Sequence, residues 1–450
     1  MRHRRDRVAF LFAIVGWASL APRSDAQVRC APLAAPTAVA AKVSGAYVVL
    51  TWKAPAGAPQ GYAVEAGSSP GTSNISVNTV DRAEFSATAP PGTYFVRVRA
   101  RNGCGLSAPS RELRVVIGVY QTRPEILVTP RTPSRNVYFP SVAKLRDGRL
   151  LVAYYDSPDH VSPLGRISMV QSRDEGLTWS APRVIVDTPL DDRDPSLMVT
   201  RDGRLLLSYF ARNSVTKTSR VFVTRSDDDG ATWSEPVNVE TSLDDSGTSS
   251  KIVEAANGDL LIPIYGSAEG TVNSRATIVR SRDGARTWPL RHEVGVAAAA
   301  GMNFSEPGLA VAGERMLLLT RTDRKDELAY AVWSGDGGVT WSEPSPVGVA
   351  AQASELVPIP GAPVTTFVHL WADWSRHWGD SRPTVAQLVR WPARAAAPAF
   401  GEPKAIYNSH CDDAGYPSGV VLDDGRVFVV FYDACQGYIG GAYLAPRTLR

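Results

Sequence analysis

The chain has 450 residues, of which 44% are hydrophobic and 21% are charged, a composition typical of a folded globular protein and not of a disordered one. Its 48 Lys and Arg residues face 45 Asp and Glu residues, so there is no basic surplus that would favour nucleic acid or an anionic membrane as a partner. The length exceeds one ordinary hydrophobic core, and we expect more than one domain.

Residues 1–26 are typical of an export signal. Four arginines between positions 2 and 7 precede an apolar stretch from residue 8 to about 21, and Ser24-Asp25-Ala26 offers a small-x-small cleavage site. The stretch is shorter than the ~20 residues that a membrane helix needs, so we expect cleavage and not an uncleaved anchor. The mature chain would be secreted or periplasmic, with no membrane span and with 43 basic and 43 acidic residues.

Residues 27–117 are expected to form a separate small β domain. Segments 48–52 and 92–100 alternate apolar and polar residues over short strands bounded by Pro and Gly turns. With Trp52, Tyr94 and the stretch 102–110, this part resembles the fibronectin type III module, a β-sandwich of about 100 residues. The resemblance implies that Trp52 and Tyr94 are core residues and not a sugar-binding platform.

The four cysteines all follow the expected cleavage site, and an even number in an oxidising compartment predicts two disulfides. The sequence alone does not fix the pairing. Cys30 with Cys104 would close the small domain, and Cys411 with Cys435 would close the last repeat unit. Neither the cysteines nor the six histidines have the spacing of a zinc site, so we expect no metal.

An eight-residue motif, Ser-x-Asp-x-Gly-x-Thr-Trp, recurs at residues 172–179, 226–233 and 334–341, with a weaker copy at 281–288 whose glycine is displaced. The serines are 54, 55 and 53 residues apart, a period typical of propellers and solenoids. Asp and Gly in this pattern predict a hairpin tip, anchored by the tryptophan. Calcium is the alternative at Asp227, Asp228 and Asp229, but the spaced acidic positions and closing glutamate of a calcium loop are missing.

Each period also holds two apolar runs joined by Asp-Gly-Arg or a relative of it, as at Asp147-Gly148-Arg149. The frame recurs six times, so each unit should contain an inner hairpin followed by the tryptophan-bearing hairpin. Two hairpins make a four-stranded blade. We therefore expect an all-β protein in which residues 118–450 form a six-bladed β-propeller behind the small sandwich, with residues 118–135 as a link that supplies a closing strand.

In a propeller the innermost strand of every blade starts near the axis, so the residues that open the six frames converge on one mouth. The candidates are Tyr138, Phe139, Arg193, Asp194, Ser249, Lys251, Glu306, Glu355 and Tyr416, and nearby strand ends add Asp156, Asp159 and Arg321. Taken singly, each residue is also compatible with an ordinary polar residue at the rim of the fold, without a role in binding. Together, carboxylates, arginines and a tyrosine in a concave mouth suit an anionic sugar.

With these motifs, residues from about 135 to 450 resemble the sialidase superfamily, whose Asp boxes are the eight-residue motif above. Segment 303–306 followed by Arg321 matches the family's catalytic glutamate, Glu306, and its central arginine. Segment 415–433 matches the segment that carries the tyrosine nucleophile, here Tyr416. Asp159 falls where the family places its acid/base aspartate, and Arg382 lies where a further substrate arginine is expected.

The resemblance implies a retaining mechanism with a tyrosine nucleophile, because the carboxylate on the anomeric carbon of sialic acid would repel an anionic one. Glu306 would take the phenol proton of Tyr416, and Asp159 would protonate the leaving oxygen and then activate water. Arginines would hold the substrate carboxylate through paired, charge-assisted hydrogen bonds. No cofactor is implied.

The first blade departs from the family pattern. Sialidases open it with an arginine directly before an Ile/Val-Pro pair, whereas this chain has Tyr138-Phe139-Pro140, with Arg135 three residues upstream of the expected place. The glutamate that steadies that arginine in the family is Asp433 here. Either Arg135 reaches in from its loop, or the substrate is not an ordinary sialoside.

The expected function is therefore a secreted exo-sialidase-like glycosidase acting on a sialylated or other glycan. A propeller glycosidase for another terminal sugar, such as an arabinan, and a non-catalytic carbohydrate-binding propeller are the alternatives. The joint presence of Glu306, Arg321 and Tyr416 favours an enzyme. The sequence does not predict the oligomeric state.

Overall fold

The computed structural model describes residues 31–44, 47–90, 92–117, 120–268, 271, 273–323, 327–375 and 381–449. The expected signal and Cys30, and with it the predicted Cys30–Cys104 pairing, lie outside these residues. The described part is all-β, with short 3-10 turns at η1 (Leu290–His292) and η3 (Pro446–Leu449). None of its helices has the length and apolar character needed to cross a membrane.

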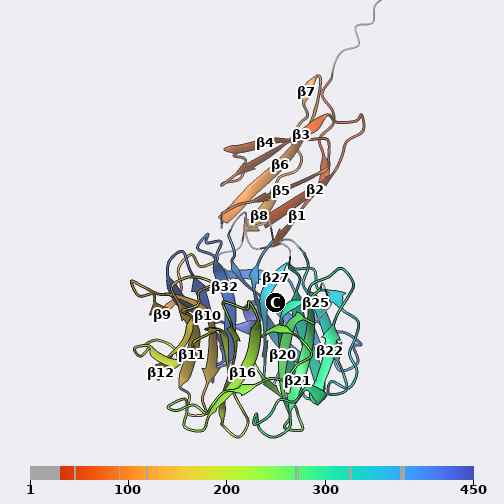
Figure 1. Cartoon of the computed structure of the whole chain (residues 1–450). Helices are drawn as coiled ribbons and strands as arrows, with labels where there is room; N and C mark the ends of the chain where they lie inside the picture. Colours follow the sequence, from red (N-terminus) through yellow and green to blue (C-terminus); the bar gives the residue numbers. More distant parts are fainter. Residues whose placement is uncertain are drawn as a thin grey trace, which may run out of the picture.

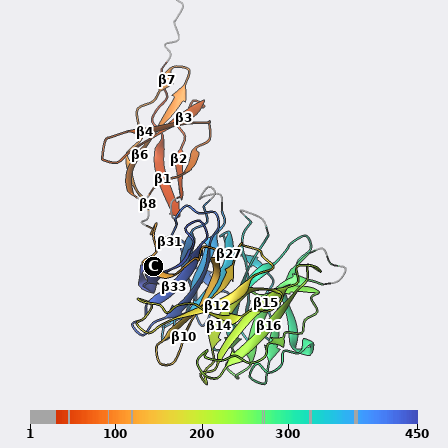
Figure 2. The same cartoon turned by 60° about the vertical axis from the view of Figure 1, so that its left-hand side comes forward.

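The first described part of the chain forms two packed antiparallel sheets (Figures 1 and 2). One is β1 (Thr37–Ser44), β2 (Tyr47–Lys53) and β5 (Glu84–Thr88), and the other is β4 (Ile75–Thr79), β3 (Gly61–Gly67), β6 (Gly92–Asn102) and β7 (Gly105–Leu106), with β8 (Leu113–Ile117) also paired to β6. Their inward-facing side chains make one core around Trp52 and Tyr62, whose rings are 5.0 Å apart. The alternation predicted for residues 48–52 and 92–100 therefore has its expected cause, one face of each strand buried against the other sheet.

Six further antiparallel sheets follow in chain order, and we number them sheet 1 to sheet 6. Sheet 1 is β10 (Asn136–Lys144), β11 (Leu150–Ser157), β12 (Arg166–Ser172) and β13 (Arg183–Val186); sheet 2 is β14 (Asp191–Val199), β15 (Leu205–Arg212), β16 (Ser219–Ser226) and β17 (Val237–Asn238). Sheet 3 is β18 (Asp245–Gly247), β19 (Val253–Glu254), β20 (Leu260–Ser267), β21 (Arg275–Ser281) and β22 (Glu293–Ala297). Sheet 4 is β23 (Ser305–Ala312), β24 (Arg315–Arg321), β25 (Tyr330–Ser334) and β26 (Ser345–Pro346).

Sheet 5 is β27 (Ala351–Pro358), β28 (Thr365–Asp373), β29 (Thr384–Trp391), β30 (Ala399–Phe400) and β31 (Lys404–Tyr407). Sheet 6 is β32 (Ala414–Val421), β33 (Val427–Asp433) and β34 (Tyr438–Leu444), and its outer strand is β9 (Ile126–Pro130), which precedes sheet 1 in the chain. Sheet 6 is thus completed from both ends of this region. In addition, β32 contacts β10 of sheet 1, so the last sheet lies against the first.

Neighbouring sheets pack face to face through apolar side chains. The contacting pairs are β10 with β14, β16 with β18, β20 with β23, β23 with β27, and β27 with β32. The small sandwich stands at one end of this set, where Lys42 and Tyr47 share a groove with Phe400 and Glu402 of sheet 5 (Figures 1 and 2).

The four Asp boxes form the turns between the last two strands of each of sheets 1 to 4. In the first copy, Asp174 accepts hydrogen bonds from the backbone N–H and the hydroxyl of Thr178, at 2.9 and 2.6 Å, and Ser172 Oγ accepts from Gly176 N at 2.9 Å. Asp228, Asp283 and Asp336 repeat this pattern. Thr and Ser hydroxyls and backbone amides satisfy each carboxylate, as the hairpin-tip prediction required.

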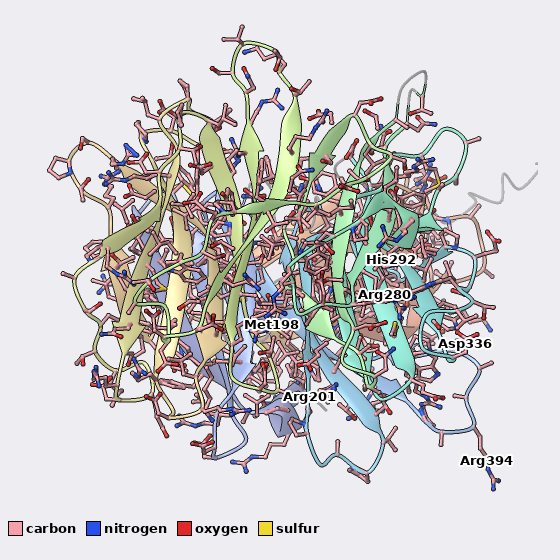
Figure 3. The ribbon with its side chains drawn as sticks, turned by 60° about the horizontal axis from the view of Figure 1, so that its bottom comes forward. Met198, Arg201, Arg280, His292, Asp336 and Arg394 are labelled. Atoms are coloured by element: carbon pink, nitrogen blue, oxygen red, sulfur yellow. A yellow bond between two sulfur atoms is a disulfide. The ribbon has the colours of Figure 1, made fainter. Side chains whose placement is uncertain are left out.

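The Asp-box turns also join neighbouring sheets. Gly176 adopts φ +96°, and a Cβ there would lie 2.9 Å from Phe428 of sheet 6. In sheet 4, Gly337 O accepts from Arg280 of sheet 3 at 3.3 Å, and Figure 3 shows Arg280 and Asp336 on adjacent sheets. The predicted disulfide between Cys411 and Cys435 is present, with Cα atoms 5.8 Å apart, and it ties the loop before β32 to the loop after β33.

Candidate active site

The first strands of five of the six sheets share one backbone distortion. The residues Phe139, Asp194, Glu306, Ala353 and Tyr416 all have φ of 46 to 48°, and the strand register shifts at each of them. A residue other than glycine in this left-handed region costs roughly 1–2 kcal/mol and is typical of functional sites. Sheet 3 differs, because residues 248–252 separate its strands β18 and β19.

Four of the five strained residues line one cavity, and Glu306 adjoins it through its hydrogen bond with Tyr416. Its walls include Phe139, Asp194, Ala353 and Tyr416, together with Ser249 from sheet 3 and Glu355 from sheet 5. The structure therefore brings together residues from five sheets that are up to 277 positions apart in the chain (416 − 139). Convergence on one mouth was the central site prediction.

Tyr416, Glu306 and Arg321 form the most closely coupled group in this mouth. Tyr416 Oη donates to Glu306 Oε1 at 2.5 Å, and Arg321 Nε lies 2.9 Å from Glu306 Oε2. Ala353 N donates to the same Oε2 at 3.2 Å, which fixes the carboxylate from sheet 5. Burial, and then the charge of Glu306, raises the pKa of Tyr416 well above its ordinary value, so the resting phenol is protonated and its proton points at Glu306.

Arg382 also lies near Tyr416, with its guanidinium carbon 5.8 Å from the Tyr416 ring centre. Its donors reach Gln352 Oε1 at 3.0 Å, Asp413 Oδ1 at 3.0 Å and Tyr432 Oη at 2.5 Å. Burial raises the pKa of Asp413, but hydrogen bonds from His160 and Tyr432 outweigh this effect and lower it below its usual value. Arg382 is thus held as a fixed cation at the wall of the mouth.

Asp194 is a buried carboxyl, and its Oδ1 makes no hydrogen bond among the described residues. Burial raises its pKa to about 7, against the opposing effect of the neighbouring Arg193 charge. Arg193 itself points into the sheet, with its guanidinium carbon 5.0 Å from the Tyr155 ring and its Nη1 3.4 Å from Asp191 Oδ2. Of this predicted pair, Asp194 lines the cavity, whereas Arg193 packs against Tyr155 and Asp191 of the surrounding sheets.

Tyr138 stands where the sialidase resemblance calls for a first-blade arginine, and its ring lies in an aromatic cluster, 5.7 Å from Phe139 and 5.4 Å from His160. The ring of Phe139 lies 4.7 Å from Tyr416, 5.0 Å from His160, 5.4 Å from Tyr432 and 5.7 Å from Tyr155. Asp433, the expected partner of that arginine, is fully buried and accepts from Tyr407 Oη at 2.6 Å. The chain thus lacks the first-blade arginine, and Asp433, at the position of that arginine's partner, binds Tyr407.

Arg135 does not fill that place. Its Nε donates to Asp156 Oδ1 at 2.8 Å, and its Nη2 donates to the carbonyls of Asp156 at 3.1 Å and Leu164 at 2.6 Å. Asp156 also accepts from Arg166 and Ser168, which makes it a structural carboxylate at the end of β11. Of the predicted substrate residues, Arg135 and Asp156 therefore bind each other and the adjoining loop.

Asp159 lies in that loop, between β11 and β12, and is exposed. Its backbone carbonyl accepts from Ser157 Oγ at 2.8 Å, and the next residue, His160, packs on Phe139 and contacts Asp413 Oδ2 through Nδ1 at 2.9 Å. His160, the residue after Asp159, thus contacts Phe139, whose ring in turn lies 4.7 Å from that of Tyr416.

Two residues named from the repeat frame have another role, and several at the site were missed. Lys251 Nζ lies 2.7 Å from Glu355 Oε1, which also accepts from Gly419 N, so this pair links sheets 3, 5 and 6 beneath the mouth. The strained position in sheet 5 is Ala353, two residues before Glu355. The fifth copy of the repeat frame is weak, and aligning it on Ala353 would have indicated Gln352 as a residue near the mouth. Asp413 and Tyr432 do not occur at repeated positions, so the repeat gave no indication of them.

The comparisons with known proteins agree with this architecture. A family model described as a BNR repeat-like domain matches residues 148–429, and one described as a fibronectin type III domain matches residues 34–116. A sialidase of Micromonospora viridifaciens is 25% identical over 317 residues, covering 60% of this chain and 47% of the relative. A sialidase of Paraclostridium sordellii is 26% identical over 241 residues, covering 46% of this chain and 57% of the relative. The matched part spans about half the length of these curated relatives.

Solved structures show the same likeness of fold. The Hadza microbial sialidase Hz136 superimposes with a TM-score of 0.57 at 15% identity, covering 93% of this chain and 98% of that one. An α-L-arabinanase of Penicillium chrysogenum, complexed with arabinobiose, gives 0.54 at 14% identity, covering 72% of this chain and 98% of that one. Because the BNR repeat-like match extends over more than half of the chain and contains its Asp-box turns, the chain belongs to the BNR repeat-like domain family.

Proposed function

We propose that sheets 1 to 6 are the blades of a six-bladed β-propeller and that the protein is a secreted, retaining exo-glycosidase that releases terminal sialic acid. The observation that carries the proposal is the 2.5 Å hydrogen bond from Tyr416 Oη to Glu306 Oε1, with Arg321 beside it. A phenol and a carboxylate from different sheets, both on strained backbone, form a nucleophile and its base within hydrogen-bond reach.

In the first step, Glu306 takes the Tyr416 proton as the phenol oxygen bonds to the anomeric carbon. The bond from that carbon to the leaving oxygen breaks, and Asp159 gives the leaving oxygen its proton. In the second step Asp159 takes a proton from water as the water oxygen bonds to the anomeric carbon, the bond from that carbon to the Tyr416 oxygen breaks, and the released phenolate takes the proton back from Glu306. The two displacements restore the starting configuration.

Arg321 and Arg382 support an anionic sugar as the substrate. Arg321 pairs with Glu306, the partner of Tyr416, and Arg382 lies over the Tyr416 ring; guanidinium groups bind carboxylates through directed, charge-assisted hydrogen bonds. Asp194, with an unpartnered Oδ1 and a pKa near 7, is placed to exchange a hydrogen bond with a sugar hydroxyl.

Tyr138, at the place of the family arginine, and the adjoining Phe139 favour a second candidate, a glycosidase for a terminal sugar without a carboxylate at its anomeric carbon, such as arabinose. An aromatic ring replaces one arm of the carboxylate clamp, and aromatic faces pack on the C–H surfaces of neutral sugars. A screen of 4-nitrophenyl and 4-methylumbelliferyl glycosides separates the candidates. Turnover of sialosides alone supports the first, turnover of arabinosides alone supports the second, and binding without turnover would indicate a lectin.

Two substitutions test the mechanism. We expect Tyr416→Phe to leave the melting temperature within a few degrees of wild type and to lower kcat by at least about 10³-fold, because the oxygen that forms the intermediate is lost. Glu306→Gln should lower kcat similarly, since the phenol loses its base. A fluorinated sialic acid that traps the intermediate should label Tyr416 in the wild type, as read by peptide mass spectrometry. Wild-type turnover by the Tyr416→Phe enzyme would rule out the tyrosine mechanism.

A further inference from the structure

Arg135 holds both ends of the loop that carries Asp159. This loop, residues 158–165, follows β11 and leads into β12. At its start, the guanidinium donates to the Oδ1 and the backbone carbonyl of Asp156; at its end, the same group donates to the carbonyl of Leu164 at 2.6 Å. One planar cation therefore spans the loop base with three directed hydrogen bonds.

The apolar side chains of the loop provide few restraints. Asp159 is exposed, and Val161 and Leu164 expose 62% and 64% of their surface, so these side chains do not fix the loop. Short internal contacts, such as Leu164 N to Ser162 Oγ at 3.2 Å, shape its turn but do not tie it to the sheets. At its start, Ser157 Oγ donates to the carbonyl of Asp159 at 2.8 Å and His160 contacts Asp413; at its end, Asp192 N donates to the carbonyl of Gly165 at 3.2 Å. Among these contacts, those of Arg135 are the ones that join the two ends of the loop through one side chain.

We propose that Arg135 is a positioning residue for the general acid/base, holding the Asp159 loop at the distance from Tyr416 that proton transfer to the leaving oxygen requires. This inference rests on the proposed function, because it assigns Arg135 a role in that reaction. It gives the displaced first-blade arginine a task in proton transfer in place of contact with the substrate carboxylate.

The physical consequence depends on the leaving group. The hydroxyl oxygen of the next sugar is a poor leaving group and needs a proton as its bond to the anomeric carbon breaks. The 4-nitrophenolate ion leaves without protonation. General acid catalysis contributes about 10²–10⁴-fold when it is needed. A loosened loop should therefore slow the hydrolysis of a sialyl-lactose far more than that of 4-nitrophenyl sialoside.

The test compares Arg135→Ala with Arg166→Ala on both substrates. Arg166 is the matched control, because its Nε donates to the same Asp156 carboxylate, at Oδ2 and 2.9 Å, but it lies on β12 outside the loop. We expect Arg135→Ala to lower kcat/KM for sialyl-lactose about 10- to 100-fold and that for the nitrophenyl sialoside less than about threefold. Arg166→Ala should keep the wild-type ratio, and Asp159→Ala should show the same split as Arg135→Ala, in larger degree.

The ratio between the two substrates is internal to each enzyme sample, so a partly unfolded variant lowers both rates without changing it. Equal loss on both substrates in Arg135→Ala, an unchanged enzyme, or the same split in Arg166→Ala would each overturn the positioning role. Failure of the proposed function looks different. In that case the wild type turns over neither sialoside, or Tyr416→Phe retains full activity on both.

Discussion

Strained single residues place the chemistry of this protein. Glu306 and Tyr416 have left-handed backbone at the bulges of β23 and β32, which costs roughly 1–2 kcal/mol each. The bulge turns each side chain out of the alternating pattern of its strand and towards the mouth. The neighbouring strands, almost fully buried, provide the packing that keeps this conformation in place.

Asp194 makes the stability of the protein depend on pH. Burial raises its folded-state pKa to about 7, above the roughly 3.9 of an unfolded aspartate, so the carboxyl stabilises the fold fully below pH 4 and loses that contribution as the pH rises through 7. Asp194→Asn should remove this pH-dependent loss of stability. Between pH 5 and pH 8, we expect the free energy of unfolding of the variant to rise relative to that of the wild type by on the order of 2–4 kcal/mol. Urea unfolding of both proteins at the two pH values measures it. An identical pH dependence in the variant would contradict the assignment.

At the scale of elements, the Asp-box glycines serve two purposes at once. They supply positive φ at the hairpin tip, and they leave room for the neighbouring sheet. Gly176 and Gly148, both in turns of sheet 1, separate these effects, because their φ values are +96° and +88° but only Gly176 is close to another group, Phe428. A Cβ on Gly148 would meet nothing within 4 Å.

We therefore expect Gly148→Ala to cost about 1 kcal/mol, the price of positive φ alone. Gly176→Ala should cost about 1–3 kcal/mol more, since the methyl group would displace the Phe428 ring. Thermal and urea unfolding of the two variants provides the comparison. Equal destabilisation would mean that the turn does not pack on sheet 6 as described.

At the scale of the whole molecule, the two ends of the region formed by the six sheets meet in sheet 6. Strand β9 pairs with β34, and Gln121 pairs with Tyr407 of sheet 5. The small sandwich precedes both contacts. The natural boundary for a shortened protein therefore lies near residue 118 and not at the start of sheet 1.

We expect a chain beginning at residue 118 to fold and to keep its activity on small glycosides. A chain beginning at residue 132 lacks β9, and the exposed edge of β34 should make it aggregate or melt well below the first. Size-exclusion chromatography and thermal melts compare the two. Loss of activity in a well-folded 118–450 protein would show that the sandwich shapes the site, and equal behaviour of both would mean that β9 does not close sheet 6.

The sequence by itself determined the all-β class, the repeat and the hairpin turns, because these depend on local patterns such as Asp-Gly turns and alternating apolar residues. It offered Cys411–Cys435 as one possible pairing, which the structure then decided. It also indicated Glu306, Arg321 and Tyr416, since the repeat frame and the family motifs mark where each strand enters the mouth. It did not predict where Arg135 binds, that Glu355 pairs with Lys251, or that Gln352, Asp413 and Tyr432 surround Arg382. Those partners lie on other sheets or in loops between strands. Only the packing of the sheets against one another decides which of them come within hydrogen-bond distance.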